Sequence, residues 1–361
     1  MINPYPKIGK FPVKQGILNY TLTELEKILA DEGLPKFRAE QIFIWLYRFG
    51  KTSFFEMTNI GKDLQNKLDQ MFYIYRPQIA KISESKDGTI KFLLKMSDTN
   101  TIETVFIPEA KRNTICVSSQ VGCSVGCKFC NTGYNGFLRN LSAEEIISQF
   151  LIVKDHLNLW NPESERLSNI VFMGMGEPLF NHECVLKVIR NLISDEKEGL
   201  SRRKITLSTS GISPILEKIV ENLPCRLAIS LHAPNDTIRS QIMPINNIYN
   251  IESIMKACQV YSKYHEYLKI TFEYLLLKDV NDSKDCALEL INLLKNINAK
   301  VNLLQFNSWD GCNFKPSNRA EEFSSILQKA GIEAPIRTRR GEDIMAACGQ
   351  LSSSNKLKGA H

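Results

Sequence analysis

Three cysteines lie close together in the stretch "CSVGCKFC", where Cys123, Cys127 and Cys130 have the spacing C-x3-C-x2-C. Thiolates this near in the chain can converge on one metal centre. A structural zinc site normally takes four protein ligands, and no second Cys/His pair follows at zinc-finger spacing. Three ligands on a four-iron cluster leave one iron open for a substrate or cofactor. The spacing favours such a cluster, and a zinc site with a distant fourth ligand is the alternative.

The other cysteines are scattered, and Cys348 is the last of them, in "IMAACGQLSSS" near the C-terminus. The beginning of the chain, "MINPYPKIGKFPVKQG", lacks the apolar core of an export signal. In a reducing cytosol, metal or thiol chemistry is expected rather than disulfides. Small buried cysteines are common and inert, so Cys348 alone would be interpreted as a core residue. The same default applies to the other isolated cysteines: Cys116, Cys184, Cys225, Cys258, Cys286 and Cys312.

The composition is that of an ordinary globular protein. Of the 361 residues, 43% are hydrophobic and 23% are charged. No apolar run reaches the roughly eighteen residues that a membrane span needs. The net charge of +6 permits a nucleic-acid partner without requiring one, because affinity for phosphate depends on how charges cluster. We expect a cytoplasmic protein with no membrane partner, and we take it to be a monomer.

Hydrophobic periodicity divides the chain into four ranges. Residues 1–90 predict amphipathic helices that form an accessory domain, whose basic face is either solvated or contacts an anionic polymer, and residues 91–110 predict a β extension. Residues 111–351 alternate six apolar strands with helices, one of which begins with a capping box of Ser142 and Glu145. Residues 352–361 predict a disordered tail. Six β/α units favour an α/β fold with a parallel sheet, either open and doubly wound or closed as a barrel.

Short polar motifs follow several of the predicted strands. They are "MGMGEP" (173–178), "LSTSG" (207–211), "SLH" (230–232) and "QFN" (305–307). Ligand groups gather at the carboxyl ends of parallel strands, and the glycines of the first motif would let a ligand approach the backbone. Taken alone, Gly-x-Gly is typical of a tight turn, and His232 of a hydrogen-bonded core histidine.

The cysteine motif, with Phe129 before its third cysteine, resembles the signature of radical S-adenosylmethionine (SAM) enzymes. The resemblance implies a [4Fe-4S] cluster on Cys123, Cys127 and Cys130 whose open iron binds SAM. An electron from the cluster then splits SAM to give a 5′-deoxyadenosyl radical. It also implies a partial (β/α)6 TIM-like barrel, in agreement with the six units above. The cofactor contacts that it implies are Gly176, Glu177, Ser208, Ser230, Leu231, His232 and Asn307.

Longer blocks narrow the resemblance to RlmN-type adenine-C2 RNA methyltransferases and cover residues ~20–351. They include "FRAEQIFIWLY", "SSQVGC", "FLRNLSAEEI", "VFMGMGEPL", "AISLHAPND" and "CGQL". The Cfr-type enzymes, which methylate C8, share the cluster and both outlying cysteines. Pro178 and Ser210 are more similar to the C2 pattern. Two departures are Asn131, where a small residue usually follows the cluster, and "NSWDGCNFKPS", which replaces an Asn-Pro opening.

The chemistry of this family gives roles to the outlying thiols. An aromatic C2 carbon is electrophilic, so ordinary methyl transfer fails and a carbon radical must be delivered. The resemblance implies that Cys348 accepts a methyl group from one SAM, and that a radical from a second SAM removes hydrogen from it. The methylene radical then adds to C2. Glu103 accepts the C2 proton, and Cys116 releases the RNA by forming a transient disulfide with Cys348.

The partners implied by the resemblance are 23S ribosomal RNA and adenosine 37 of transfer RNA. An electron donor such as flavodoxin or ferredoxin, with its reductase, would reduce the cluster. Candidate phosphate contacts are residues 201–204, residues 337–340 and the basic N-terminal helices. Two other functions stay open at this point. They are a zinc-stabilised RNA-binding protein without catalysis, and a radical activase that acts on protein and needs neither Cys116 nor Cys348.

Overall fold

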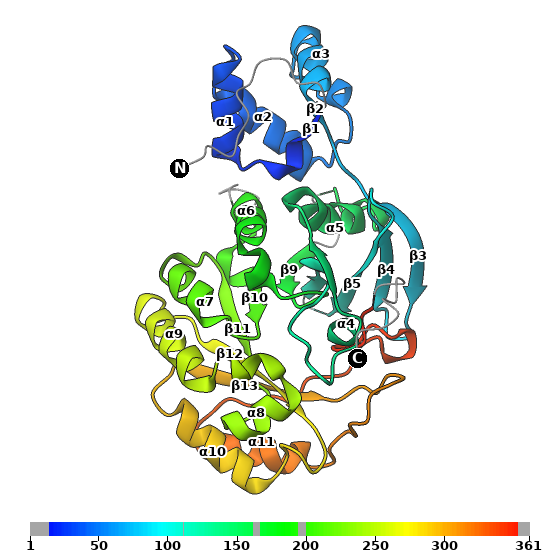
Figure 1. The fold of residues 1–361 in the computed structure, drawn as a ribbon. Helices are drawn as coiled ribbons and strands as arrows, with labels where there is room; N and C mark the ends of the chain where they lie inside the picture. Colours follow the sequence, from blue (N-terminus) through cyan, green and yellow to red (C-terminus); the bar gives the residue numbers. More distant parts are fainter. Residues whose placement is uncertain (1–13, 111, 162–166, 194–199, 353–361) are drawn as a thin grey trace.

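The computed structural model describes residues 14–110, 112–161, 167–193 and 200–352 (Figure 1). Its centre is a sheet with nine strands in the described part of the chain, in the order β13-β12-β11-β10-β9-β6-β5-β4-β3. Six of these strands are parallel: β6 (Arg112–Cys116), β9 (Leu167–Phe172), β10 (Ile205–Thr209), β11 (Arg226–Ser230), β12 (Ile270–Leu276) and β13 (Ala299–Gln305). This confirms the six predicted β/α units.

The parallel strands are arranged as in a barrel rather than as in a doubly wound sheet. From β6 to β13 the order across the sheet follows the order along the chain, so no crossover reverses direction. The helices therefore lie along one outer face, as Figure 1 shows. They are α5 (Ala143–His156), α6 (His182–Ile193), α7 (Ser213–Ile219), α8 (Asp236–Ile242), α9 (Ile251–Tyr264), α10 (Lys284–Leu294) and α11 (Ala320–Lys329).

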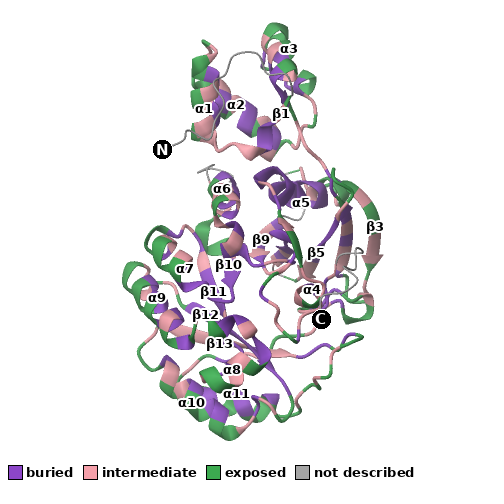
Figure 2. Ribbon diagram, viewed as in Figure 1, coloured by how far each residue is buried: buried purple, intermediate pink, exposed green. Residues whose placement is uncertain are grey.

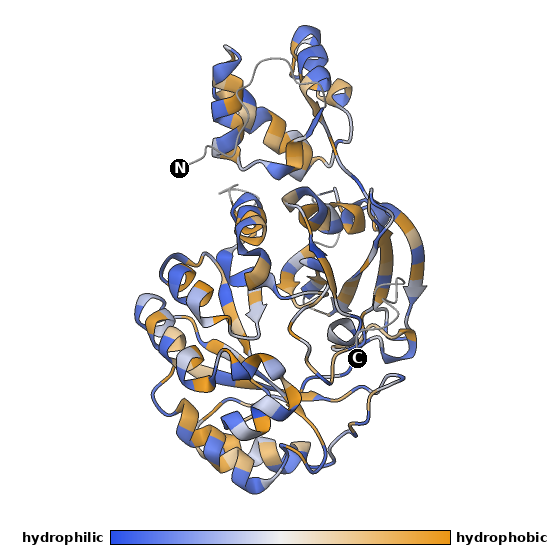
Figure 3. Cartoon of the chain, viewed as in Figure 1, coloured by the Kyte–Doolittle hydropathy of each residue, from blue (hydrophilic) through white to orange (hydrophobic). Residues whose placement is uncertain are grey.

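The strands are nearly continuous apolar runs because both of their faces are covered. Every residue of β12 is buried, and Figures 2 and 3 show buried, apolar residues along the neighbouring strands. Helix α5 begins at the predicted capping box: the Glu145 amide donates to Ser142 Oγ at 3.2 Å, and the Ser142 amide donates to Glu145 Oε2 at 2.9 Å. No helix of the described residues is long and apolar enough to cross a membrane.

Three antiparallel strands extend the sheet beyond β6. They are β3 (Gln78–Glu84), β4 (Ile90–Lys95) and β5 (Thr101–Glu109). Strand β3 lies within the range 1–90 for which helices were predicted. Its residues pair with β4 along the edge of the sheet instead of packing as a helix. A hairpin of β7 (Gln120–Gly122) and β8 (Phe137–Asn140) follows β6, and the short helix α4 (Asn131–Tyr134) lies between these two strands.

The N-terminal region forms a small helical unit above α5 and α6 in Figure 1. Its elements are β1 (Gln15–Gly16), α1 (Leu22–Asp31), α2 (Phe37–Phe43), the π-helical turn Ile44–Arg48, α3 (Lys62–Met71) and β2 (Phe72–Tyr73). Thr21 and Glu24 form a capping box at the start of α1. Tyr73 Oη donates to Glu144 Oε1 at 2.9 Å, and the Asn191 amide side chain donates to the Tyr20 carbonyl at 3.0 Å. The unit is therefore attached to α5 and α6 by specific polar contacts.

Candidate active site

The three clustered cysteines lie on the loop that joins β7 to α4. The loop is held by its backbone: the Cys123 amide donates to the Gly136 carbonyl at 2.8 Å, and the Lys128 amide to the Ile242 carbonyl at 3.0 Å. Burial raises the pKa of the Cys123 thiol to about 12 and that of Cys127 well above its usual range. The neighbouring thiols raise both pKa values further. The fold thus brings the three thiols within electrostatic reach of one another.

The donor set fits an iron–sulfur cluster better than a single ion. Within the described ranges, no three His, Cys, Asp or Glu side chains are arranged to hold one metal ion. A cluster takes one thiolate on each of several irons, so its ligands need not meet at one point. The buried thiols also have few charged partners, and bound iron would favour the thiolate forms that burial disfavours. Thiol chemistry and placement are therefore compatible with a cluster at this loop.

Gly176 and Glu177 connect the end of β9 to the neighbouring strands. Gly176 has φ +98°, and a Cβ atom there would lie 2.5 Å from Gln120, so only glycine fits. The Glu177 carboxylate is buried and accepts four hydrogen bonds. The donors are the Leu179 amide (3.0 Å), Thr209 Oγ1 (2.7 Å), the Ser210 amide (2.8 Å) and Ser210 Oγ (2.8 Å). A cofactor contact by this carboxylate would require exchange of one of these bonds.

His232 is held beside the cysteine loop in its neutral form. Its Nδ1 accepts a hydrogen bond from the Leu275 amide at 3.0 Å, so the ring proton is on Nε2. Burial, with the nearby Arg239 charge, lowers the pKa of His232 to about 3. The ring lies edge-to-face with Phe129 at a centroid distance of 4.9 Å. His232 therefore packs against the cysteine loop with a neutral ring. Ser230 ends β11, and Leu231 follows it.

Ser208 and Asn307 lie at the ends of β10 and β13 and are both buried. The Asn307 Oδ1 atom is buried without any hydrogen-bond partner among the described residues. A buried amide oxygen without a partner is energetically unfavourable unless a ligand supplies a donor. This is the observation on the cofactor-contact residues that points most directly to a bound molecule.

Arg239 is a buried residue of the site that sequence reasoning missed. Its side chain from α8 is fully buried, and burial lowers its pKa to about 10. The guanidinium donates to backbone carbonyls at the ends of two strands: Ser210 (2.6 Å), Ser230 (3.2 Å) and Leu231 (3.1 Å). Its charge also lowers the pKa of Cys127. The signal was its place in "APNDTIRS", directly after a strand-end motif.

Cys348 and Cys116 come together although 231 residues separate them in the chain. Cys116 ends β6 and is buried, which raises the pKa of its thiol to about 12. Cys348 is exposed to solvent, yet protein encloses its thiol closely enough to raise its pKa to about 12 as well. Smaller contributions to this pKa come from three neighbours: Cys130, Glu273 and Cys116. The last cysteine of the chain thus lies near both the resolving candidate and the cysteine loop.

Glu103 lies on β5 beside residues 341–352, which carry Cys348 and are called the Cys348 segment below. Its carboxylate is buried, and Lys91 Nζ pairs with its Oε1 at 2.9 Å. The Ser352 amide donates to its Oε2 at 2.9 Å. Lys91 Nζ also donates to the Met345 carbonyl at 2.9 Å. Both ends of the Cys348 segment therefore contact the antiparallel extension, and Glu103 is one of the contacts.

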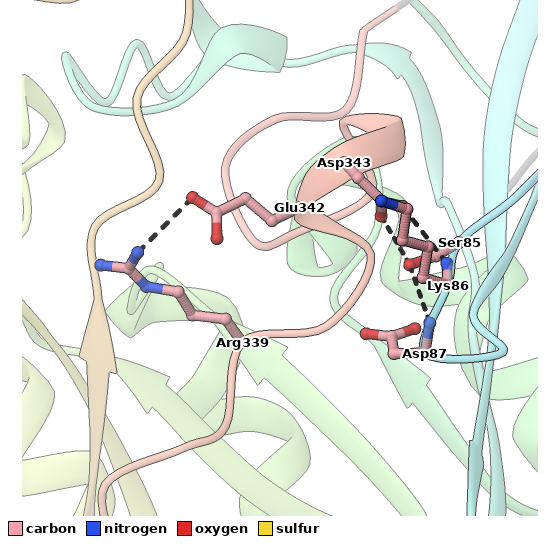
Figure 4. Close-up of a pocket in the computed structure, with 6 residues that line it drawn as sticks. All are labelled: Ser85, Lys86, Asp87, Arg339, Glu342 and Asp343. Carbon is pink, nitrogen blue, oxygen red and sulfur yellow. Dashed lines mark hydrogen bonds and ion pairs between the residues drawn. The ribbon is translucent and has the colours of Figure 1, made fainter.

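The turn between β3 and β4 binds the beginning of the same segment. Asp343 accepts hydrogen bonds from Ser85 Oγ at 2.5 Å and from the Lys86 amide at 3.2 Å, and the Gly341 amide donates to Asp87 Oδ2 at 3.0 Å. A pocket lies between this turn and the residues that lead to Cys348. Ser85, Lys86, Asp87 and Asp343 lie on one side of it, and Arg339 and Glu342 lie on the other (Figure 4). These contacts hold residues 341–345 in a defined position. The tail beyond Ser352 lies outside the described residues.

Glu273 is a second buried carboxylate near Cys348, and sequence reasoning missed it. It lies on β12, and Asn302 Nδ2 on β13 donates to its Oε1 at 2.9 Å. Burial raises the pKa of Glu273 to about 7, against the lowering effect of the Asn302 hydrogen bond. A nearly continuous apolar strand gives no sign that one of its residues is ionisable at neutral pH.

The candidate RNA contacts lie in separate places on the molecule. The 3₁₀ helix Arg202–Lys204 precedes β10 and is exposed. Residues 337–340 run from β13 toward the Cys348 segment, where Arg339 Nη1 lies 3.5 Å from Glu342. In the N-terminal unit, the Arg38 guanidinium lies 4.8 Å from the centre of the Phe37 ring. The structure does not join these groups into one basic patch.

Two family models match the chain. The Radical SAM superfamily model matches residues 117–291. The model of the ribosomal RNA large subunit methyltransferase N-terminal domain matches residues 15–74. The first range contains the cysteine loop and strands β9 to β12 of the sheet, and the second contains the helical N-terminal unit.

Relatives match nearly the whole chain. Dual-specificity RNA methyltransferase RlmN of Rhodospirillum rubrum is 45% identical over 353 residues, which cover 96% of this chain and 82% of that protein. The protein of the same name from Dinoroseobacter shibae is 45% identical over 356 residues, 95% of this chain and 90% of that protein. The crystal structure of a radical SAM methyltransferase from Sphaerobacter thermophilus has 40% sequence identity and a TM-score of 0.85. The match covers 93% of this chain and 99% of that chain.

The fold and the relatives lead to the same assignment. The partial barrel and the cysteine motif are those of the radical SAM superfamily, whose members use a [4Fe-4S] cluster and SAM. The N-terminal unit and the identity over almost the full length are shared with RNA methyltransferases. The assignment to an enzyme family rules out the non-catalytic zinc protein. The chain belongs to the RlmN family of radical SAM RNA methyltransferases.

Proposed function

We propose that this protein methylates C2 of an adenosine in 23S ribosomal RNA and C2 of adenosine 37 in transfer RNAs. The observation that supports the proposal is the placement of Cys348 beside the cysteine loop. The Asn131 amide donates to the Gly349 carbonyl there, and both Cys130 and Cys116 influence the pKa of the Cys348 thiol. A C2 methylation that uses a methylated cysteine needs a carrier thiol near both the radical source and a resolving thiol. The two curated relatives are named dual-specificity RNA methyltransferases, which supports two classes of RNA substrate.

Each of the predicted site residues keeps a role in this proposal. Cys123, Cys127 and Cys130 hold the cluster, which with bound SAM supplies a carbon-centred radical. The SAM contacts are Gly176, Glu177, Ser208, Ser230, Leu231, His232 and Asn307. The unpartnered Oδ1 of Asn307 supports its place in this set. Two SAM molecules are consumed per turnover, one for the methyl group and one for the radical.

Cys348 carries the methyl group, and Cys116 releases the product. Cys348 loses its proton and attacks the methyl carbon of a SAM molecule. An S–C bond forms at the Cys348 sulfur as the bond from the methyl carbon to the sulfonium sulfur breaks, and S-adenosylhomocysteine leaves. Removal of a hydrogen atom from this methyl group would leave a methylene radical that adds to C2. The resulting base radical would pass one electron to the oxidised cluster, and Glu103 accepts the C2 proton. The Cys116 thiolate then attacks the Cys348 sulfur: the S–S bond forms as the bond from sulfur to the methylene carbon breaks. The electron pair of that bond stays on carbon, which takes up a proton and becomes the methyl group.

The partners follow from this chemistry. A one-electron donor, such as flavodoxin or ferredoxin with its reductase, reduces the cluster, and a thiol reductant reopens the disulfide. Because the proposed substrates are ribosomal and transfer RNA, the enzyme acts in the cytoplasm. We propose that it works as a monomer, since all of the named site residues come from one chain.

The test is mass spectrometry of ribosomal and transfer RNA from cells with and without the gene. The proposal predicts that 2-methyladenosine disappears from one site in 23S RNA and from position 37 of transfer RNAs. Loss of 8-methyladenosine would instead assign the Cfr-type reaction. Unchanged RNA in the deletion strain would contradict the proposed substrate altogether.

A further inference from the structure

The segment that follows Cys348 lies directly against helix α4, next to the cysteine loop (Figure 1). The Asn131 backbone amide donates to the Gly349 carbonyl at 2.8 Å, and Asn131 Nδ2 donates to the Gln350 carbonyl at 3.1 Å. Thr132 Oγ1 donates to the Leu351 carbonyl at 2.7 Å. Two consecutive residues of α4 thus bind three consecutive carbonyls after Cys348.

The orientation of the Asn131 side chain is set by its own neighbour in the helix. Asn135 Nδ2 donates to Asn131 Oδ1 at 3.2 Å and to the Asn131 carbonyl at 2.9 Å. Because the amide oxygen accepts from Asn135, the amino group faces the Gln350 carbonyl. The first backbone amides of a helix have no partner within the helix, and the Gly349 carbonyl supplies one here.

Gly349 permits this close approach. Its φ is +82°, and a Cβ atom at this position would lie 3.3 Å from the Phe129 carbonyl oxygen. A larger residue would be strained in this backbone conformation and would crowd the cysteine loop. The Gln350 side chain adds a bond on the other side, from Nε2 to the Ser308 carbonyl at 3.1 Å. The segment is therefore held by specific bonds immediately after the thiol.

We propose that Asn131 is a positioning residue that ties the Cys348 segment to the loop of Cys123, Cys127 and Cys130, and so fixes the Cys348 thiol relative to them. The catalytic consequence rests on the proposed function, whereas the tether does not. An alanine or a serine at position 131 would have no amino group to reach the Gln350 carbonyl. If Cys348 travels between cofactor, RNA and Cys116, these bonds must break, so they set how readily the segment leaves this position.

The variant that tests the tether is Asn131→Asp, which keeps the shape of the side chain but removes the donor. The matched control is Asn298→Asp, because Asn298 Nδ2 also donates to one backbone carbonyl, that of Glu266, at 3.1 Å. Hydrogen–deuterium exchange of the full-length protein follows the amides of Ala347 and Gln350, which are bonded within the segment. We expect about fivefold faster exchange in Asn131→Asp, as for one lost hydrogen bond, and no change in the control.

A second variant, Asn131→Ser, separates the lost donor from the introduced charge. It should raise exchange in the same segment. An effect in Asn131→Asp alone, or unchanged exchange in both variants, would overturn the tether. Equal melting temperatures of the variants and the wild type are expected, since α4 has only four residues. A general loss of protection across the chain would also contradict a local role.

The link to the reaction has its own readouts. In both variants we expect a smaller fraction of protein with methylated Cys348 and a several-fold lower kcat, while the KM for SAM stays within twofold of wild type. Faster exchange with normal methylation of Cys348 would overturn the positioning role in the reaction. If wild-type Cys348 is never methylated, the proposed function fails, while the exchange experiment still decides on the tether.

Discussion

The thiols of Cys116 and Cys348 share a chemical difficulty. Each has a pKa raised to about 12, mainly by the surrounding protein, yet each must act as a thiolate in the proposed reaction. Glu273 lies near Cys348, and burial places its pKa at about 7, so a carboxylate that can take a proton is close to the carrier thiol. Cys116 ends a buried strand, and burial is the main cause of its raised pKa. Because the Cys116 thiol is mostly protonated near neutral pH, we expect its deprotonation to limit product release.

Replacing the two cysteines should have different effects. Cys348→Ala removes the carrier sulfur, so no methyl group from SAM should appear on the protein. Cys116→Ala leaves the carrier intact but removes the thiol that breaks the final bond, so a covalent protein–RNA adduct should accumulate. Denaturing gels and mass spectrometry of the protein distinguish the two. Cys258→Ala, a buried cysteine of α9, is the control and should retain turnover. Free methylated RNA from Cys116→Ala would refute its resolving role.

Release of RNA from the adduct should accelerate with pH. Below a pKa of about 12, the thiolate fraction of Cys116 rises about tenfold for each pH unit. In a single-turnover experiment with preformed adduct, the release rate should therefore rise about tenfold from pH 7 to 8 and again from pH 8 to 9. An exposed thiol of ordinary pKa would instead give a rate that begins to level off near pH 9. Such a plateau would contradict the effect of burial on this residue.

At the scale of elements, the site depends on how the ends of neighbouring strands are held together. Glu177 binds the end of β10 from the loop after β9, through Thr209 and Ser210. Arg239 binds the ends of β10 and β11 from α8. A carboxylate and a guanidinium, both buried, thereby satisfy polar groups that have no partner within the sheet. They fix the positions of the backbone on which the cysteine loop rests.

Arg239→Met should destabilise the protein strongly. Methionine retains a long, flexible side chain at this position. It leaves the carbonyls of Ser210, Ser230 and Leu231 without their hydrogen-bond donor. We expect the free energy of unfolding to fall by about 3 kcal/mol, as when one partner is removed from a buried charged network. Urea unfolding of the cluster-free protein measures it, with Lys256→Met on the exposed face of α9 as the control. A loss below about 1 kcal/mol would show that these bonds contribute little.

At the scale of the whole molecule, the N-terminal unit extends the surface next to α5 and α6 (Figure 1). Its exposed aromatic rings include Phe37 and Phe49, and the guanidinium groups of Arg38 and Arg48 lie over them at 4.8 and 5.3 Å. Aromatic rings and arginines together suit unpaired bases and phosphates. The unit is about 60 residues long in its family model, too large to serve only as a cover for two helices.

Substituting both arginines should weaken RNA binding without affecting the cysteine loop. If each contacts one phosphate, Arg38→Gln with Arg48→Gln should lower the slope of log affinity against log salt by roughly 1.5. Cleavage of SAM without RNA should be unchanged, because the substitutions lie in a separate unit. Lys218→Gln with Lys256→Gln, on α7 and α9, changes the net charge equally and is the control. Equal losses in both pairs would indicate a general charge effect rather than a contact surface.

Much of the architecture could be predicted because it depends on local patterns. The six parallel strands were predicted from apolar runs, and the capping box of Ser142 and Glu145 from two residues. Strand β3 was missed because its alternation is weak, with most of its residues partly or fully exposed at the edge of the sheet. The burial of Arg239 and Glu273 was also missed. For Arg239 the only sequence signal was its place after a strand-end motif, and Glu273 gave no local sign that it would be enclosed.

By itself, the sequence determined the class of chemistry: three closely spaced cysteines, glycines at a strand end and a cysteine before a polar tail are local features. Only the tertiary structure decided which groups meet. Cys348 lies near Cys116 because Lys91, Glu103 and Asn131 bind the chain end to the antiparallel extension and to α4. Such contacts join residues more than 200 positions apart, except for the Lys91–Glu103 pair on adjacent strands. No periodicity records them, because they depend on the packing of the whole chain.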